Sequence, residues 1–186
     1  MINKTNNKTL GVMQPYIFPY IGYFCHIHAS DNFIIYDDVG FIKQGWINRN
    51  RILLHGKIHN FVIPLSQSTS NRLINEIKIH NFSQFKKKFI NTIYHGYKST
   101  KYFDQGMEYL DMVTNGPADK ISDLATSSIT HAIKILKIKT NIKLSSTISP
   151  KNNDLDRSDR LIYLTKLSGC STYLNTMGGK DLYDPS

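Results

Sequence analysis

The chain has 186 residues, of which 40% are hydrophobic and 20% are charged, which is enough apolar content for one domain with its own core. No run of about 18 apolar residues occurs, and the residues after Met1 are polar, so we expect neither a membrane-spanning helix nor a secretory signal peptide. Two cysteines, Cys25 and Cys170, are too few for a disulfide framework or a four-thiolate zinc site. We therefore expect a cytoplasmic protein without a metal site, whose cofactor and oligomeric state the sequence leaves unknown.

The formal net charge is +9, from 23 basic and 14 acidic residues. Such an excess attracts polyanions, namely nucleic acid, nucleotide phosphates and anionic lipids. Only five of the basic residues are arginines, and proteins that recognise bases or phosphates favour the planar guanidinium group. We therefore interpret most of the excess as solvated surface and expect no nucleic-acid partner, with a non-catalytic polyanion-binding protein as a further alternative. The small, phosphate-bearing substrate that we expect follows from the motifs described below.

The chain begins with a predicted strand over 9–13, a loop over 14–19, a helix over 20–29 and a strand over 32–36. The loop cannot be helical because each of its prolines restricts the residue before it. The order of strand, loop, helix and strand favours a parallel βαβ unit. Such a unit brings the first loop and the Asp37–Asp38 pair to the edge where open α/β sheets bind ligands.

The remaining segments are assigned from apolar periodicity and from turn residues. Ser83 is the predicted N-cap of a helix over 83–97. The predicted inward face of a later helix, over 120–136, consists of Leu124, Ser128, Ala132 and Ile135. We predict a single α/β domain over 1–186, with a mostly parallel sheet, a nucleotidyltransferase-like βαβ start and an inserted hairpin; the order of the strands is not derivable. The predicted elements are a β-hairpin over 51–65, a strand over 74–79, helices over 83–97, 102–113 and 120–136, a strand over 142–148, a helix over 159–167 and a strand over 171–174.

The segment 14–24 concentrates two prolines, a glycine and five aromatic residues between the first strand and the first helix. A helix that begins near Gly22 directs unpaired backbone N–H groups toward an anion, and the glycine allows close backbone approach. The alternative is that the aromatic side chains cover the sheet edge as a hydrophobic plug. The predicted phosphate or carboxylate pocket has Gln14, Tyr16, Tyr20, Gly22 and Tyr23 as substrate-binding residues.

Residues 20–23 have the spacing of the His-x-Gly-His loop of nucleotidyltransferases, but tyrosines replace both histidines. Because phenols carry no positive charge, adenylyl transfer by that route is not expected. His26 and His28 lie two apart on the predicted helix and point in different directions, which argues against a shared metal site. His26 is a candidate catalytic residue, with ordinary packing as the alternative.

Asp37 and Asp38 follow the second predicted strand and are expected to face opposite sides of it, so that at most one points into the crevice. A carboxylate there can orient a sugar hydroxyl or act as a general base that takes a proton from an attacking amine. We therefore predict Asp37 or Asp38 as catalytic, the alternative being that they cap the following turn.

Residues 43–51 place the only tryptophan beside two asparagines and two arginines. Trp46 offers a flat face for a sugar or a base, and a guanidinium group can hold a diphosphate with two N–H groups. The alternative is a tryptophan that anchors a loop. The last strand runs into a glycine-rich segment of the kind that can surround a phosphate. The predicted substrate-binding residues of these two segments are Lys43, Trp46, Asn48, Arg49, Asn50, Arg51, Gly178, Gly179 and Lys180.

Several stretches together resemble the WbqC-like protein family, which is associated with bacterial O-antigen and other surface-polysaccharide gene clusters. The resemblance covers nearly the whole chain, and it implies that members usually extend further than Ser186, into a segment absent here. The matching stretches are Gln14-Pro15 with Phe18-Pro19 and Gly22-Tyr23, Asp37-Asp38-Val39, Trp46-Ile47-Asn48-Arg49-Asn50, and Tyr173-Leu174 with Gly178-Gly179-Lys180.

The resemblance implies a pathway more than a reaction, since enzymes of such clusters build and modify nucleotide-activated sugars. We predict a transferase that modifies a nucleotide-activated amino sugar, with acyl or aminoacyl transfer as one task that fits. The sequence shows no recognisable Ser-His-Asp or Cys-His arrangement. This favours direct transfer assisted by a general base over a covalent enzyme intermediate. The alternative, from the order of strand, loop and helix, is an ATP-dependent nucleotidyltransferase or a ligase-type enzyme.

Overall fold

The computed structural model describes residues 7–66, 71–116, 118–150 and 155–176. The chain divides into two compact units, each with its own core. The prediction that residues 1–186 form a single domain stays a prediction. Unit 1 consists of Met1–Gln14, Tyr20–Asp38 and Lys137–Ser186, and unit 2 of Pro15–Pro19 and Val39–Leu136.

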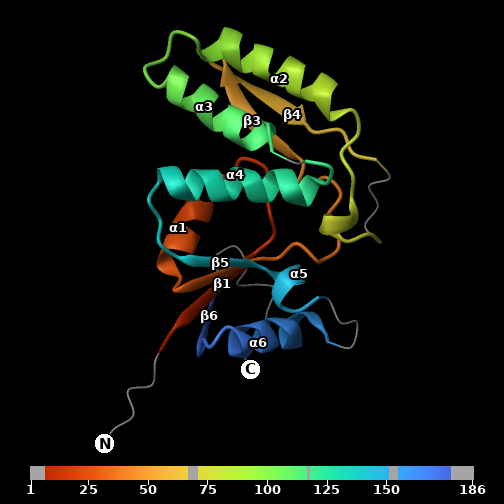
Figure 1. The fold of residues 1–186 in the computed structure, drawn as a ribbon, viewed down its shortest axis with the longest axis vertical. Coiled ribbons are helices and arrows are strands. Elements are labelled where there is room, and N and C mark those ends of the chain that lie inside the picture. Colours follow the sequence, from red (N-terminus) through yellow and green to blue (C-terminus); the bar gives the residue numbers. More distant parts are fainter. Residues whose placement is uncertain (1–6, 67–70, 117, 151–154, 177–186) are drawn as a thin grey trace, which may run out of the picture. The chain divides into compact units, whose positions relative to one another are not determined.

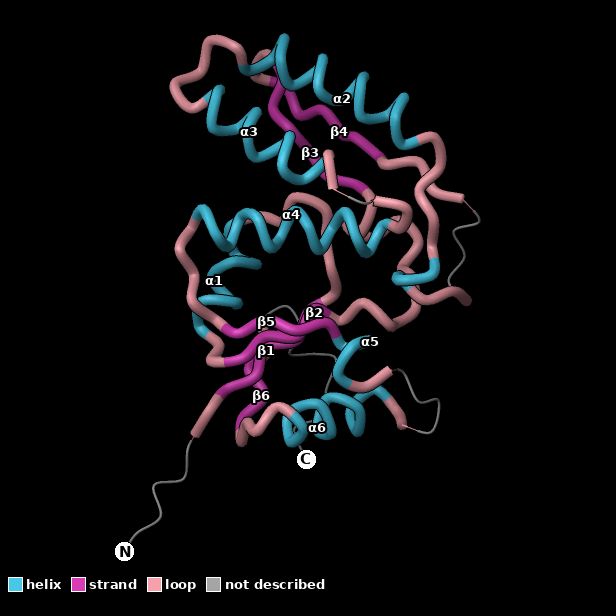
Figure 2. Tube along the Cα trace, viewed as in Figure 1, coloured by secondary structure: helices cyan, strands magenta, loops and turns pink. Residues whose placement is uncertain are grey.

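Unit 1 is built on a sheet of four strands in the order β5-β2-β1-β6, in which every neighbouring pair is parallel (Figure 2). The predicted α/β class and the parallel sheet are therefore confirmed. The central strand β1 is nearly fully buried, as expected for a parallel sheet covered on both faces. The strands are Thr9–Met13 (β1), Asn32–Ile35 (β2), Asn141–Leu144 (β5) and Thr172–Leu174 (β6).

The two faces of this sheet are covered by different helices, α1 (Ile21–Ala29) and α6 (Arg157–Leu167) (Figure 1). Alternate residues of a strand point to opposite faces. Val12 and Ile34 are paired in the sheet and pack in one cluster with the apolar residues of α6. On the other face, a Cβ atom on Gly11 would lie 2.4 Å from Ser30 Oγ and 2.8 Å from His26 Nε2. Glycine at this position therefore lets α1 lie close against β1.

We expect Gly11→Ala to lower the free energy of unfolding by roughly 1–3 kcal/mol, because the added methyl group collides with α1. The measurement is urea denaturation. The control is Gly106→Ala in α3 (Phe103–Thr114), where an added Cβ meets nothing within 4 Å and alanine should stabilise by about 0.5–1 kcal/mol. Equal stability of the two variants would contradict this account.

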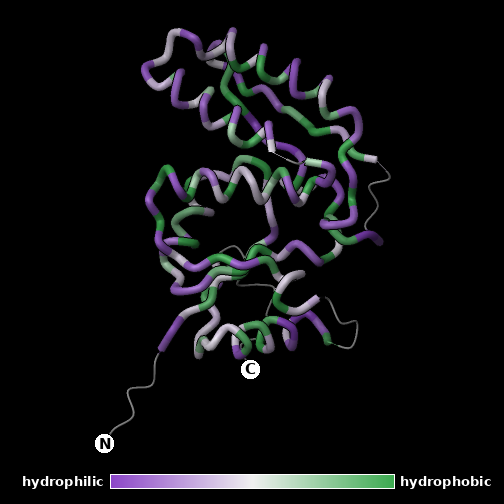
Figure 3. The backbone as a smooth tube through the Cα atoms, viewed as in Figure 1, coloured by the Kyte–Doolittle hydropathy of each residue, from purple (hydrophilic) through white to green (hydrophobic). Residues whose placement is uncertain are grey.

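Unit 2 contains a β-hairpin, β3 (Arg49–Leu54) and β4 (Lys57–Val62), as predicted. Its two-residue turn has positive φ at both His55 (50°) and Gly56 (75°), which is the turn geometry that matches the twist of paired strands. Beside the hairpin this unit has three long helices, and Figure 3 shows hydrophobic and hydrophilic residues alternating along α2 and α3. These helices are α2 (Phe82–Tyr97), α3 and α4 (Ile121–Ile135).

Two details of the predicted helices are wrong. The N-cap residue of α2 is Asn81, with left-handed backbone, and not Ser83. In α4 Leu124 and Ser128 are buried as predicted, but Ile135 is 56% exposed. The buried stripe of α4 instead advances by four residues at a time to Ile133, since the helix has 3.6 residues per turn.

Two predicted strands are also wrong or shortened. The strand predicted over 142–148 ends at Leu144 and gives way to a short helix, α5 (Ser145–Ile148), whose first side chains bond to residues after β2. The strand predicted over 74–79 contains a single 3-10 turn, η1 (Ile74–Glu76). Among the described residues, this segment forms only isolated bridges, Leu65 with Ile79 and Lys78 with Lys120.

None of the helices in the described part of the chain is long and apolar enough to cross a membrane.

Candidate functional site at the carboxyl edge of the sheet

The strand order of unit 1 determines which segments meet at the carboxyl edge of the sheet. The chain runs outward from β1 to β2 and β5, and then returns to β6 on the other side of β1. The order therefore reverses between β1 and β6, and open α/β sheets bind ligands beyond the carboxyl ends of their strands at such a switch point. Gln14 follows β1, Asp37 and Asp38 follow β2, Ser145 follows β5, and Asn175 follows β6.

Asp37 and Asp38 form a buried polar cluster with the first residues of α5. Asp37 Oδ1 accepts hydrogen bonds from Ser145 Oγ (3.0 Å) and from the Ser146 backbone N–H (3.0 Å). The other oxygen of Asp37 accepts one from Ser146 Oγ (2.6 Å). Ser145 Oγ also lies 2.5 Å from Asp38 Oδ1, so the single proton of this hydroxyl serves one carboxylate at a time.

Arg160 completes this cluster from α6. Its Nη2 atom donates to Asp38 Oδ2 (2.7 Å) and to the Ser149 carbonyl (2.8 Å). Both side chains of the ion pair are only 3% exposed. Removal of one partner from such a pair costs about 3–5 kcal/mol, because it leaves a buried charge uncompensated. The pair therefore holds α6 against the end of β2.

The expectation that Asp37 and Asp38 face opposite sides of a strand is wrong. The strand β2 ends at Ile35, and the Asp37 N–H then bonds to the Ile35 carbonyl at 3.1 Å, which turns the chain. Both carboxylates consequently reach Ser145. The alternative prediction, that the two aspartates cap the following turn, does not account for their contacts with α5 and α6.

Sequence reasoning missed Arg160, Ser145 and Ser146. Arg160 carried one usable signal, since it lies beside Leu161 and four residues before Leu164, on the inward face of an amphipathic helix. A charged residue on such a face needs a buried partner. The two serines had none, because residues 142–148 were assigned to a strand.

The predicted phosphate-binding residues of unit 1 lie around the start of α1. The Tyr23 hydroxyl is buried and donates to the Gln14 carbonyl at 3.0 Å, so it fixes the end of β1. Tyr20 precedes the helix and is 67% exposed. A Cβ atom on Gly22 would lie 2.3 Å from the Tyr20 ring, so this glycine accommodates that ring. Whether these residues bind an anion stays a prediction.

His26 is a buried residue of α1, and its ring lies next to the end of β6. Its Nε2 atom lies 3.0 Å from the Leu174 carbonyl, and because a carbonyl only accepts, Nε2 carries the proton. The ring packs edge-on against Phe33. Burial lowers the pKa of His26 from its ordinary value of 6.5, and the hydrogen bond to Leu174 opposes that change. In this structure His26 joins α1 to β6, and its predicted catalytic role stays a prediction.

We expect His26 to make the folded state less stable in acid. Its pKa is lower in the folded than in the unfolded chain, so the stability that its neutral ring contributes above pH 6.5 is lost as the pH falls through the folded pKa. The measurement is the free energy of unfolding of the wild type and of His26→Gln between neutral and mildly acidic pH. Their difference should shrink with falling pH, and a difference that stays constant over this range would contradict this account.

The segment Pro15–Pro19 belongs to unit 2, where it lies against residues 47–50. The Ile17 N–H donates to the Ile47 carbonyl at 3.2 Å. The side-chain Nδ2 of Asn50 donates to the carbonyls of Ile17 (2.9 Å) and Phe18 (2.7 Å). The Phe18 ring packs in the aromatic core of unit 2 and is stacked on Phe89 at 5.9 Å. Tyr16 is half-buried against the same core. The aromatic side chains predicted as a plug over the sheet edge therefore pack partly in the core of unit 2.

We expect Asn50→Asp to destabilise the protein by on the order of 3 kcal/mol, because a carboxylate oxygen would face two carbonyl oxygens in place of an N–H donor. Chemical denaturation measures the change. Exposed Asn60→Asp, on the neighbouring strand, serves as the control and should stay within about 0.5 kcal/mol of the wild type. A neutral effect of Asn50→Asp would show that this amide does not fix the proline segment.

The predicted recognition segment 43–51 divides into buried amides and exposed groups. Asn48 is buried and donates to the Ile63 carbonyl at 2.8 Å, so this amide nitrogen is also used within unit 2. Trp46 is 43% exposed, and the Arg51 guanidinium carbon lies 4.7 Å from the centre of its ring. Lys43 is exposed, and Arg49 is half-buried. Within this segment, Trp46 and Arg51 form an exposed aromatic and cationic pair that a ligand can reach.

The predicted residues Gly178, Gly179 and Lys180 lie outside the described residues. Leu174, which precedes them at the end of β6, is paired in register with Gly11 of β1.

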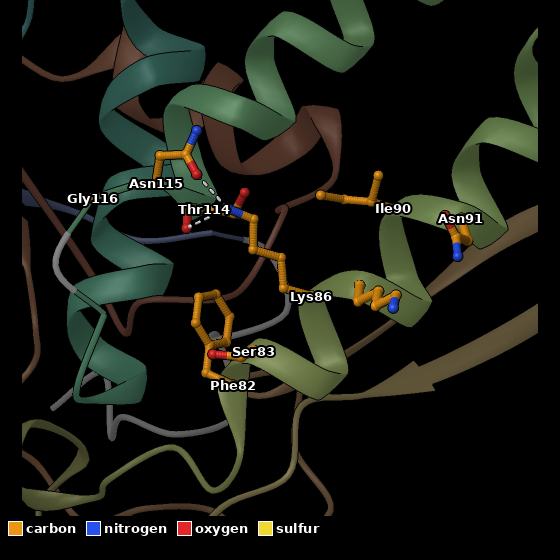
Figure 4. Close-up of a pocket in the computed structure, with 9 residues that line it drawn as sticks. Phe82, Ser83, Lys86, Ile90, Asn91, Thr114, Asn115 and Gly116 are labelled. Atoms are coloured by element: carbon orange, nitrogen blue, oxygen red, sulfur yellow. Dashed lines mark hydrogen bonds between the residues drawn. The ribbon is translucent and has the colours of Figure 1, made fainter.

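An open pocket of about 480 Å³ lies in unit 2, between the start of α2 and the end of α3 (Figure 4). Lys86 extends across it, and its Nζ donates to the Thr114 carbonyl at 3.3 Å and to the side chain of Asn115. This ammonium group therefore satisfies acceptors at the end of α3, where cations are favoured by the helix dipole. Because no predicted site residue lines this pocket, we place the candidate site at the sheet edge instead.

Comparison with known proteins gives one family. The model of the WbqC-like protein family matches residues 14–186, and this chain belongs to that family. Among curated proteins, the chain is similar to the protein named "Uncharacterized protein Rv1507c" of Mycobacterium tuberculosis (strain ATCC 25618 / H37Rv), with 38% identity over 58 residues. The matched segment covers 31% of this chain and 25% of that protein. No solved structure matches.

Proposed function

We propose that this protein is a cytoplasmic transferase that modifies a nucleotide-activated sugar during the assembly of a bacterial surface polysaccharide such as O-antigen. The observation that carries the proposal is the pair of buried carboxylates, Asp37 and Asp38, at the carboxyl edge of a parallel sheet. That edge is where α/β proteins bind their ligands. Membership of the WbqC-like family supports the choice of pathway.

In this proposal Asp37 acts as the general base. Asp38 forms an ion pair with Arg160, whereas Asp37 has no cationic partner among the described residues. In an acyl or aminoacyl transfer, the amine of an amino sugar attacks the carbonyl carbon of the donor. The new C–N bond forms, the bond to the leaving group breaks, and the proton of the amine passes to the carboxylate.

We further propose that Trp46 and Arg51 of unit 2 bind a nucleotide through its base or its diphosphate. An exposed aromatic face stacks on a ring, and a guanidinium group beside it pairs with phosphate oxygens. Both side chains are exposed, so a ligand can contact them from solvent.

We expect Trp46→Ala to weaken binding of a nucleotide-sugar about tenfold, since one base stacked on an aromatic ring is worth about 1–3 kcal/mol. Isothermal titration calorimetry with a panel of UDP-, GDP- and dTDP-sugars measures this. Tyr102→Ala, which removes another exposed aromatic side chain of unit 2, is the control and should bind as the wild type does.

Absence of binding by every nucleotide-sugar and acyl donor would refute the proposed transferase. Release of pyrophosphate from ATP in the presence of candidate acids would favour the nucleotidyltransferase or ligase alternative instead. That alternative has one supporting feature, the parallel β1-α1-β2 unit with which the described chain begins.

A further inference from the structure

Arg160 has hydrogen-bonding capacity that the described residues do not use. A guanidinium group carries five N–H bonds, one on Nε and two on each terminal nitrogen. The two N–H bonds of Nη2 serve Asp38 and Ser149. Nε and Nη1 are buried and have no hydrogen-bond partner among the residues that the structure describes. Buried polar groups in native proteins nearly always have partners, so these two nitrogens require an explanation.

The position of Arg160 connects these free donors to the candidate site. The side chain is 3% exposed, and Asp38 and Ser149 hold its guanidinium group in place. It thus lies in the cluster at the carboxyl edge of the sheet, in contact with one of the two carboxylates. A guanidinium group held in this way presents its remaining N–H groups in a fixed direction.

The charge of the cluster indicates what it binds. Two carboxylates, Asp37 and Asp38, stand against one guanidinium group, and the other members of the cluster are serines. A phosphate group would bring further negative charge next to an excess of carboxylate in a buried region, which is unfavourable. An ammonium group would balance the charge, but it has no acceptor for the free N–H groups of Arg160.

A hydroxyl group matches both requirements, because it accepts one hydrogen bond and donates another. Neighbouring hydroxyls of a sugar can accept from Arg160 Nε or Nη1 and donate to the remaining lone pairs of Asp38. An aromatic face also borders the guanidinium group, since its carbon lies 5.8 Å from the ring centre of half-buried Tyr36.

We propose that Arg160, held by Asp38, is a binding residue for the hydroxyl groups of the sugar and not for the phosphates of the substrate. The proposal rests on the proposed function and names the part of the nucleotide-sugar that this edge of the sheet recognises. Because the two nitrogens are buried, the ligand reaches them after a local opening of the side chains around them. The hydrogen bonds gained then stabilise the bound arrangement.

The first test compares Arg160→Lys with Arg157→Lys by calorimetry. Lysine at 160 keeps a charge for Asp38 but lacks the Nε and Nη1 donors, and Arg157 is an exposed arginine of the same helix. The probes are UDP-glucose and UDP-N-acetylglucosamine, with UDP as the reference. We expect Arg160→Lys to weaken the UDP-sugars about tenfold and UDP not at all, and Arg157→Lys to change neither. Equal weakening of UDP and the UDP-sugars, or no weakening, would overturn the proposal.

The second test uses the unaltered protein, so it does not depend on the folding of a variant. The Nε–H signal of Arg160, assigned in a ¹H–¹⁵N spectrum by triple-resonance experiments on the unaltered protein, should shift when glucose or N-acetylglucosamine is added. An ordered water as the partner of these nitrogens would leave the signal unmoved by sugar, and this result would overturn the proposal.

The two proposals fail in different ways. If free sugars shift the Arg160 signal while UDP-sugars bind no more tightly than free sugars, the sugar site stands and the proposed function is wrong. If UDP-sugars bind and the signal does not move, the proposed function stands and the role of Arg160 is wrong. If no sugar and no nucleotide-sugar binds, both are wrong.

Discussion

Parallel pairing of the four strands of unit 1 is the constraint on which its candidate site depends. Because all four strands run in the same direction, the residues that follow β1, β2, β5 and β6 emerge at one edge of the sheet. An antiparallel neighbour in place of β5 would carry Ser145 to the opposite edge, away from Asp37 and Asp38. Gly11 is part of the same constraint, since it allows α1 to lie close to the central strand.

The buried ion pair of Asp38 and Arg160 adds a second constraint on this edge. Two charges removed from water are not by themselves strong evidence of stability, because desolvation offsets much of their attraction. The pair instead gives the helix α6 a defined position relative to the ends of β2 and β5. The guanidinium group keeps two nitrogens without a hydrogen-bond partner among the described residues. Because it is already fixed, it would lose less conformational entropy on binding a ligand than a flexible surface arginine would.

Unit 2 shows how one sequence segment serves both structure and proposed function. The side-chain amides of Asn48 and Asn50 donate hydrogen bonds to backbone carbonyls. One of these carbonyls belongs to Phe18, whose backbone is left-handed (φ 48°). A bulky residue adopts that conformation only where its surroundings impose it. Trp46, which precedes these asparagines, and Arg51, which follows them in β3, remain exposed to solvent.

The sequence by itself determined the local elements of this protein. Apolar periodicity located the helix α1, the hairpin and the strands β1, β2 and β6, because the burial of one face imposes a repeat of 3.6 or 2 residues. It also placed the Asp37–Asp38 pair shortly after a strand, and its motifs indicated the WbqC-like family to which the chain belongs.

Only the tertiary structure decided which residues far apart in the chain meet. The pairing of β6 with β1 and of β5 with β2, and the contacts of Ser145 and Arg160 with the two carboxylates, join residues more than 100 positions apart. No local pattern encodes such contacts, since a serine or an arginine looks the same in sequence whether its partner is water or a buried carboxylate. The tertiary structure also showed that the asparagines of segment 43–51 bond to backbone carbonyls, whereas its tryptophan and Arg51 stay exposed. The sequence could not distinguish these roles, because the carbonyls that accept from the asparagines come near them only when the chain has folded.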